Sequence, residues 1–263
     1  GACHFPCRQE EEFGPSMENA IAAGLSRQIV LTRALEATAN NIANQTTAGF
    51  KAERVAFREF LANIPGGSET ALADDPDVSL VIDPDSYTDF SAGGLEPTYG
   101  DLDFAIDGDG FFAVETGDGA RYSRDGRFSL NVFGELVTRD GARVLDAGGA
   151  PILLDQQAGP PLLTPEGELQ QNGAPIARLG VFTFDDPRSL QKIGDNLFTS
   201  EEEPSGAPFA RLRQGFVETS NVVAISAVTD MIEIMRAYEQ AARVIETADE
   251  TARNAISTLS DTA

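Results

Sequence analysis

The stretch ANNIANQTTAGFK, residues 39–51, ends a helical segment in an unusual way. The residues before it read as a helix with few breakers, yet Asn40, Asn41 and Asn44 follow one another closely here. Asn is a weak helix former, because its side chain competes with the helix for backbone hydrogen bonds. Gly49 can supply the left-handed turn at which helices commonly end. The stretch therefore predicts the end of a long helix, and a cluster of amides whose polar groups need partners.

Helical spacing marks both ends of the sequence. Within residues 17–44 one seam, with steps of four and three, runs along Ile21, Leu25, Gln28, Thr32, Leu35, Ala39 and Ile42. From about residue 222 to residue 259 a second seam runs along Tyr238, Ala241, Ile245, Ala248, Ala252, Ala255 and Leu259. Such heptad spacing is typical of helices that pack on other helices, and Asn221 is placed to cap the second one. We expect the two helices to pack on each other, on another chain, or on both.

The centre of the chain has a different character. Asp-Gly pairs at 107–108, 109–110, 118–119, 125–126 and 140–141 punctuate short alternating runs such as FFAV, and such pairs are hairpin signals. Residues 62–98 and 146–175, rich in turn-forming residues, read as long loops. The sequence therefore predicts an α+β fold in which the N- and C-terminal helices pack as a coiled-coil-like pair, within a terminal helical assembly domain of residues 17–60 and 222–263. Residues 61–221 are expected to form a central antiparallel β domain.

The first residues differ from the rest of the chain. Cys3, Cys7 and the sole histidine, His4, lie here, and neither residue type occurs after position 7. Catalysis or metal binding by Cys or His of the main body is therefore excluded, as is a small disulfide-stapled domain. The CHFPC cluster offers three soft ligands, one fewer than a structural zinc site uses. Residues 1–16 lack the pattern of a secretory signal, and we expect them to be a leader or a remnant that precedes a natural start at Met17.

The charge of the chain restricts its partners. A net charge of −23 argues against nucleic acid, which needs a patch of Lys and Arg, and equally against an anionic membrane surface. The longest apolar run is far shorter than the roughly 20 residues that cross a bilayer. We expect no nucleic-acid binding and no membrane insertion.

Three chemical motifs fail when their surroundings are considered. GDGFFA, residues 108–113, has dinucleotide-binding spacing, but strand-like residues follow it in place of a helix, and Asp107 and Asp109 would repel phosphate. The same acids fail the calcium-loop pattern, since Ala105 and Phe111 occupy ligand positions. Paired carboxylates could serve a hydrolase, but the chain has no Trp for a sugar platform. We expect no enzyme activity, no cofactor and no metal site.

Three blocks of the sequence follow one another in a recognisable order. The N-terminal block carries the pattern N-N-[IL]-A-N at residues 40–44, followed by T-x-G-[FY]-[KR] at Thr47, Gly49, Phe50 and Lys51. The central block is AIDGDGFFAVETGDGARYSRDGRFSLNVFGELVTRDGARVL, and the C-terminal block begins with LRQGFVETSNVV. In this order the blocks resemble the bacterial flagellar rod and hook family of axial proteins, and the resemblance covers essentially all of residues 17–263. Members of that family usually have Asn or Asp where Val223 stands, which affects a local cap contact.

The resemblance implies a structural subunit, most similar to the proximal-rod branch of the family, with the distal-rod branch as the close alternative. Such subunits are exported by the flagellar type III system, polymerise helically in the periplasmic rod of the basal body, and transmit torque from motor to hook. The implied partners are further copies, other rod proteins, the export apparatus and the surrounding rings. Amides at the helix end would then satisfy a neighbouring helix or chain. The implied assembly interface comprises Leu35, Asn40, Asn41, Ile42, Asn44, Thr47, Gly49, Phe50, Asn221, Tyr238, Ala241, Ile245, Ala248 and Ala252.

Two other classes of protein stay open from the residues alone. An acidic chain of this kind could be a calcium-dependent extracellular binding module, which millimolar calcium would stabilise. A carboxylate-based hydrolase would reveal itself by turnover of a glycan.

Overall fold

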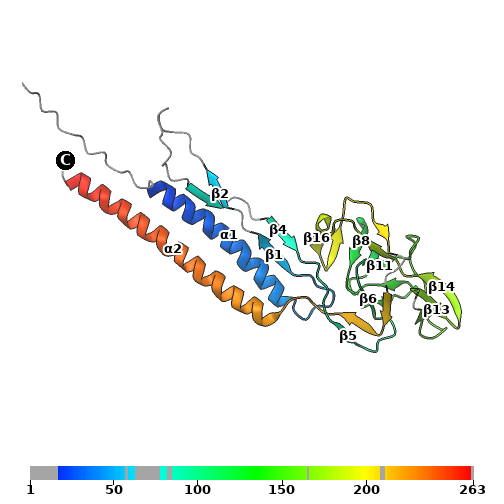
Figure 1. Cartoon of the computed structure of the whole chain (residues 1–263). Helices are drawn as coiled ribbons and strands as arrows, with labels where there is room; N and C mark the ends of the chain where they lie inside the picture. Colours follow the sequence, from blue (N-terminus) through cyan, green and yellow to red (C-terminus); the bar gives the residue numbers. More distant parts are fainter. Residues whose placement is uncertain are drawn as a thin grey trace, which may run out of the picture. The chain divides into compact units, whose positions relative to one another are not determined.

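The computed structural model describes residues 17–56, 59–62, 78–81, 85–164, 166–207 and 211–261. These residues form two compact units (Figure 1). The first unit holds the described residues of the ranges 1–36, 55–85 and 230–263, and the second holds those of 37–54 and 86–229. Helices α1, Met17–Ala43, and α2, Ala224–Asp261, each contribute residues to both units. The leader, with its CHFPC cluster, lies outside the described residues, and the predicted domain boundaries remain predictions.

The terminal helices pack on each other within the first unit, as predicted (Figure 1). A Cβ atom added to Gly24 of α1 would lie 2.7 Å from Cγ1 of Ile245 on α2, so a larger residue there would force the helices apart. The buried face of α1 includes Val30, Leu31 and Ala34. The predicted seam is a different face, since Leu25 is 53% exposed. The small residue at this contact lets the backbones of α1 and α2 come close.

An antiparallel sheet of nine strands dominates the second unit. The main path of the sheet runs in the order β16 (Gln191–Gly194), β17 (Leu197–Thr199), β8 (Gly119–Ser123), β7 (Phe111–Thr116), β11 (Arg143–Val144), β10 (Leu136–Val137) and β9 (Ser129–Leu130). Off this path, β15 (Val181–Thr183) pairs with both β7 and β18 (Ser205–Gly206). A short 3-10 helix, Pro187–Ser189, precedes β16.

Smaller sheets complete the described chain. One sheet has three strands, β12 (Leu162–Leu163), β13 (Glu168–Gln171) and β14 (Ala174–Arg178). The two-stranded pairs are β1 (Glu53–Ala56) with β4 (Asp85–Thr88), β2 (Glu59–Ala62) with β3 (Val78–Val81), β5 (Leu95–Pro97) with β20 (Phe216–Glu218), and β6 (Phe104–Asp107) with β19 (Arg211–Gln214). The prediction of a mostly antiparallel central β region is confirmed.

Strand β7 forms the centre of the β core. Its residues Phe112 and Val114 belong to one buried cluster, together with Phe104 and Leu136, whereas Phe111 and Ala113 belong to a second cluster. In the second cluster the rings of Phe111 and Phe90 meet edge to face, with centroids 5.5 Å apart. The run FFAV is therefore buried on both faces and is continuously apolar, so its description as an alternating run was wrong.

Turn predictions succeed only where the flanking strands pair with each other. Asp118–Gly119 joins β7 to β8, and Asp140–Gly141 joins β10 to β11, both as hairpins. The Asp-Gly pairs at 107–108 and 109–110 form no hairpin, because β6 pairs with β19 and not with β7. The pair at 125–126 likewise lies between strands that pair elsewhere. The predicted long loops were partly wrong, since strands β3 to β5 and β12 to β14 lie within them.

Candidate functional site

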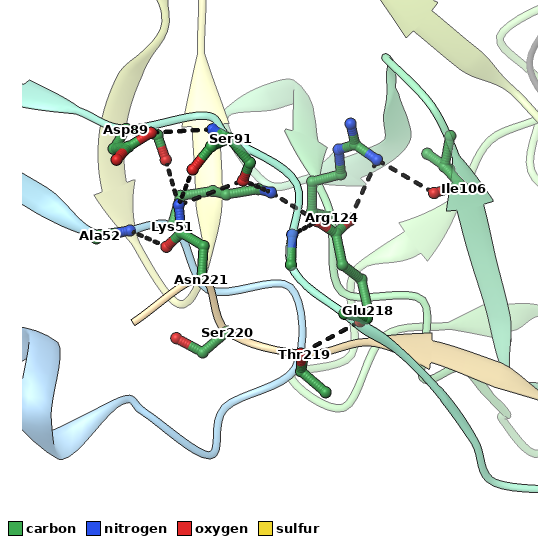
Figure 2. A network of polar contacts seen from close by, with 12 residues as sticks. Lys51, Ala52, Asp89, Ser91, Ile106, Arg124, Glu218, Thr219, Ser220 and Asn221 are labelled. Atoms are coloured by element: carbon green, nitrogen blue, oxygen red, sulfur yellow. Dashed lines mark hydrogen bonds and ion pairs between the residues drawn. The ribbon is translucent and has the colours of Figure 1, made fainter. Parts of the chain in front are cut away.

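A group of polar side chains joins three segments of the second unit to Arg124, which follows β8 (Figure 2). The segments are residues 41–53, from the last turn of α1 into β1, residues 89–94 before β5, and residues 218–221, between the end of β20 and α2. We call the group of Asn41, Lys51, Arg124, Glu218 and Asn221 the polar junction. It brings the chain leaving the N-terminal helix together with the chain entering the C-terminal helix.

Glu218 is the centre of the polar junction and is only 2% exposed. Its Oε1 accepts hydrogen bonds from Lys51 Nζ at 2.6 Å and from the Gly93 amide at 2.8 Å, while Oε2 pairs with Arg124 Nη1 at 3.2 Å. Its own backbone oxygen accepts from the Gly49 amide at 2.8 Å. The Glu218 carboxylate therefore compensates two buried cations and binds the segment at Gly93, while the backbone of the same residue binds the segment at Gly49.

Besides Glu218, the two cations bind backbone carbonyl groups. Lys51 Nζ also donates to the Ser91 carbonyl at 2.8 Å, and Arg124 Nη2 donates to the Gly108 carbonyl at 2.7 Å. Burial lowers the pKa of Lys51 below its usual value, although the nearby Glu218 carboxylate opposes that shift. Burial also lowers the pKa of Arg124, again against the pull of Glu218. Desolvation is thus the largest cost in this cluster, and Glu218 is the group that offsets it.

Asn221 links all three segments (Figure 2). Its Oδ1 accepts from the Ala52 amide at 2.7 Å, and its Nδ2 donates to the Asp89 carbonyl at 2.7 Å. The prediction that Asn221 caps the C-terminal helix is therefore wrong. Its amide oxygen and nitrogen are engaged by other segments, and α2 begins only at Ala224.

The amides at the end of α1 have partners within the chain. Asn41 forms a paired contact with the peptide groups of Glu53: its Nδ2 donates to the Glu53 carbonyl at 2.7 Å, and its Oδ1 accepts from the Glu53 amide at 2.9 Å. Asn44 Nδ2 donates to Asn40 Oδ1 at 2.8 Å, and its own Oδ1 accepts from Thr47 at 3.1 Å. These amides thus shape the exit from the helix. A further role between chains remains a prediction.

Gly49 and Phe50 pack against the β sheet. Gly49 has φ of 67°, and a Cβ atom there would lie 2.4 Å from the backbone of Arg124, so conformation and space both require glycine. Phe50 is buried, and Lys192 Nζ of β16 lies 3.8 Å from its ring centroid. Burial lowers the pKa of Lys192. Asn196 Nδ2, in the turn between β16 and β17, donates to the Ala48 carbonyl at 3.2 Å.

The predicted site residues fall into three groups. Asn41, Gly49, Phe50 and Asn221 come together at the polar junction or against it, and Asn40, Asn44 and Thr47 bond to one another beside it. Leu35 and Ile42 are half-buried on α1. The α2 residues do not join either group: Ala241 is buried, Ile245 and Ala248 are half-buried, and Tyr238 is exposed. Ala252 lies in α2, but its side chain is outside the described residues.

Sequence reasoning missed Glu218 and Arg124 as site residues, and named Lys51 only as part of a motif. A usable signal existed, since Lys51 and Lys192 are the only lysines of this acidic chain. Glu218 also ends the otherwise apolar strand FVE. Charged residues at such positions must be paired when they are buried.

The polar junction positions chain segments and has no arrangement suited to catalysis. Its carboxylate is neutralised by two cations, so it is not free to act as a general base. Among the described residues, no group of His, Cys, Asp and Glu is placed to hold a metal ion. The described helices include none long and apolar enough to cross a membrane.

Two family models match this chain. The model "Flagellar basal body rod FlgEFG protein C-terminal" matches residues 213–258, which contain β20, Glu218, Asn221 and most of α2. The model "Flagellar hook protein FlgE/F/G D1 domain" matches residues 105–172, the centre of the β region. One match therefore covers the chain entering α2, and the other covers much of the β core.

Similar proteins extend the match over nearly the whole chain. A flagellar basal-body rod protein FlgF of Caulobacter vibrioides is 40% identical over 245 residues, which is 92% of this chain and 98% of that protein. The FlgF of Mesorhizobium japonicum is 35% identical, again over 92% and 98%. A flagellar basal-body rod protein FlgG of Bacillus subtilis is 33% identical, over 89% and 96%. The expected resemblance, to the FlgF type first and to FlgG next, is thus confirmed, and this chain belongs to the flagellar basal-body rod protein family.

Proposed function

We propose that this chain is a structural subunit of the proximal part of the rod, exported by the flagellar type III system and polymerised helically to transmit torque from motor to hook. Its partners are further copies of itself, other rod proteins and the export apparatus, with the surrounding rings outside. The 40% identity to the FlgF protein of Caulobacter vibrioides, against 33% to the FlgG protein of Bacillus subtilis, favours the proximal position over the distal one.

One observation carries the proposal: α2 has an apolar face that the described part of its own chain leaves exposed. Ile225 is 83% exposed, and Val228, Ile232 and Met235 follow it, each exposed, at steps of three, four and three. This heptad spacing suits a helix of another subunit. The opposite face is used within the chain, because Ala227 and Ala241, two heptads apart, are buried.

The open face indicates that α2 makes two contacts of different kinds. Its small residues pack within the chain, and its exposed Ile, Val and Met residues await a neighbour. A coiled-coil-like arrangement then arises between subunits rather than inside one. In a rod, each subunit would repeat this contact, so burial of the exposed face would accumulate along the assembly.

Ala241 is a poor place to test assembly, because it is 6% exposed within a single chain. Ile225→Asp is the better variant. Residue 225 lies in the first turn of α2, where a carboxylate is favourable for the helix dipole, so the isolated chain should keep its thermal midpoint. Ser226→Asp, on the next residue and also at an exposed position, is the matched control.

We expect Ile225→Asp to abolish motility and to leave rods incomplete in electron micrographs of basal bodies. Ser226→Asp cells should swim normally. An unpaired charge in a buried contact costs roughly 3 to 5 kcal/mol, which a repeated interface cannot absorb. Normal swimming of Ile225→Asp cells, with the variant present in their basal bodies, would show that this face of α2 is not an assembly surface.

A further inference from the structure

The turn Asn131–Gly134, between β9 and β10, presents two large apolar side chains to solvent. Val132 is 86% exposed and Phe133 is 78% exposed. Leu153, which pairs with Glu135 in an isolated bridge beside the turn, is exposed as well. Such a cluster is unusual on the surface of a β domain and marks a contact site.

The turn is rigid rather than loose. Asn131 Oδ1 accepts from the amides of Phe133 at 2.9 Å and Glu135 at 3.0 Å, and Asn131 Nδ2 donates to Glu135 Oε2 at 2.7 Å. Gln156 Nε2 donates to the Asn131 carbonyl at 2.8 Å. The Gly134 carbonyl accepts from the Leu154 amide at 2.8 Å. The side chains of Val132 and Phe133 are therefore displayed from a fixed backbone, which lowers the entropy cost of binding.

The same unit carries a cavity of matching character. It has a volume of about 290 Å³, with buried Leu179 and Val181 among its lining residues, together with Phe182, Ala207 and Leu212. Ligand pockets for small molecules run from about 300 to 1,000 Å³, so this one suits one or two side chains. Glu166 and Arg178 also line it, one acid and one base.

Charge favours a contact between these two places. Two copies of a chain with net charge −23 repel each other, so their contact needs surfaces that add no negative charge. The tip sequence NVFG has no charged residue, and the charges of Glu166 and Arg178 at the cavity cancel. Both surfaces therefore meet the requirement.

We propose that Phe133 of one subunit inserts into the cavity at β15, β18 and β19 of a second copy of this chain. The contact joins two different surfaces, so it is heterologous, and a contact of this type builds helical arrays when it does not close into a ring. It is independent of the apolar face of α2 and adds a second, outer contact to the assembly. The inference rests on the proposed rod function, because only an assembly brings the two surfaces together.

A cross-link between two singly substituted chains tests the contact. Cells carry a mixture of Val132→Cys and Ala207→Cys chains, both with Cys3→Ser and Cys7→Ser, so that a link between positions 132 and 207 must join different chains. Basal bodies are purified, treated with a short bismaleimide and analysed by denaturing electrophoresis, with mass spectrometry of the linked peptides. We expect a dimer band whose linked peptides contain positions 132 and 207. Adding Phe133→Asp to the first chain should abolish it, without a change in the thermal midpoint of the purified variant.

The matched control replaces Val132→Cys by Ile193→Cys, an exposed apolar residue of β16 outside the turn. Basal bodies that contain both chains but yield no 132–207 link, or yield as much 193–207 link, would overturn the contact and leave the rod function standing. A link between position 132 and a different protein would also overturn it. Absence of the chain from basal bodies would overturn the rod function and this contact together.

Discussion

The polar junction buries its charged and amide side chains within the chain, whereas the apolar face of α2 leaves its side chains exposed to solvent. At the polar junction every segment is completed within the chain: Glu218 carries two cations, and Asn221 satisfies backbone groups of two other segments. On α2, apolar residues such as Ile225 stay in water. Under the proposed function, the residues around the polar junction fold without a partner, whereas the apolar face of α2 is buried only when another subunit packs on it.

The largest expected effect is at Glu218. Glu218→Gln keeps the shape of the side chain but leaves Lys51 and Arg124 buried without a counter-charge, so the free energy of unfolding should fall by about 3 to 5 kcal/mol. Urea denaturation of the purified chain, followed by near-ultraviolet circular dichroism, measures it. The control is Glu115→Gln, which breaks the exposed ion pair with Arg143 and should cost at most about 1 kcal/mol.

Equal decreases in the free energy of unfolding of Glu218→Gln and Glu115→Gln would show that Glu218 stabilises the chain no more than an exposed ion pair does. The variant Lys51→Met tests whether the loss of one cation costs less than the loss of the carboxylate. It removes one buried cation and leaves Glu218 with Arg124 and the Gly93 amide. Its loss of stability should therefore be smaller than that of Glu218→Gln.

Asn221→Ala should have the next largest effect. It removes the acceptor of the Ala52 amide and the donor to the Asp89 carbonyl, both of which belong to partly buried contacts. Groups left unsatisfied in this way cost about 1 to 3 kcal/mol in the free energy of unfolding. Asn40→Ala, at an exposed position whose side chain accepts a hydrogen bond from its neighbour Asn44, should change the free energy of unfolding by less than about 1 kcal/mol. A larger loss of stability in Asn40→Ala than in Asn221→Ala would show that Asn221 does not stabilise the chain through these contacts.

The smallest expected effect is a pH dependence that comes from Lys192. Burial lowers the pKa of Lys192 in the folded chain below 10.5, its unfolded value. Between these two pKa values the unfolded chain binds more protons, so the free energy of unfolding rises with pH across that window. In urea denaturation, the free energy of unfolding of Lys192→Met should rise less steeply with pH than that of the wild type over the range below about pH 10. Tyr122, with a raised pKa, contributes only above that range. Identical slopes would contradict the burial of Lys192.

Much of the fold could be predicted, because local patterns decide it. Heptad spacing located both terminal helices, and Asp-Gly located the β7–β8 and β10–β11 hairpins. Asn172–Gly173 also joins two paired strands, β13 and β14, but it lies in a range that composition marked as loop. The strongest short hairpin signal was thus overlooked.

The candidate site could be predicted only in part, because its contacts are long-range. Gly49 and Phe50 could be singled out from their motif. The pairing of Lys51 with Glu218 joins residues 167 positions apart, and no local pattern encodes that distance. The same is true of Asn221, whose local position suggested a helix cap, while its actual partners lie in the segments at Ala52 and Asp89.

Amide hydrogen exchange of the purified, dilute chain, measured by mass spectrometry, tests the contrast between the two units most directly. Slow exchange is expected across residues 37–54 and 86–207, where backbone groups are held by the sheet and the polar junction. Fast exchange is expected in residues 17–36 and 230–261, because the proposed assembly leaves the apolar face of α2, at Ile232 and Met235, without its partner in the dilute chain. Equally slow exchange in both sets of residues would contradict the account, because the terminal helices would then be stable without a neighbour.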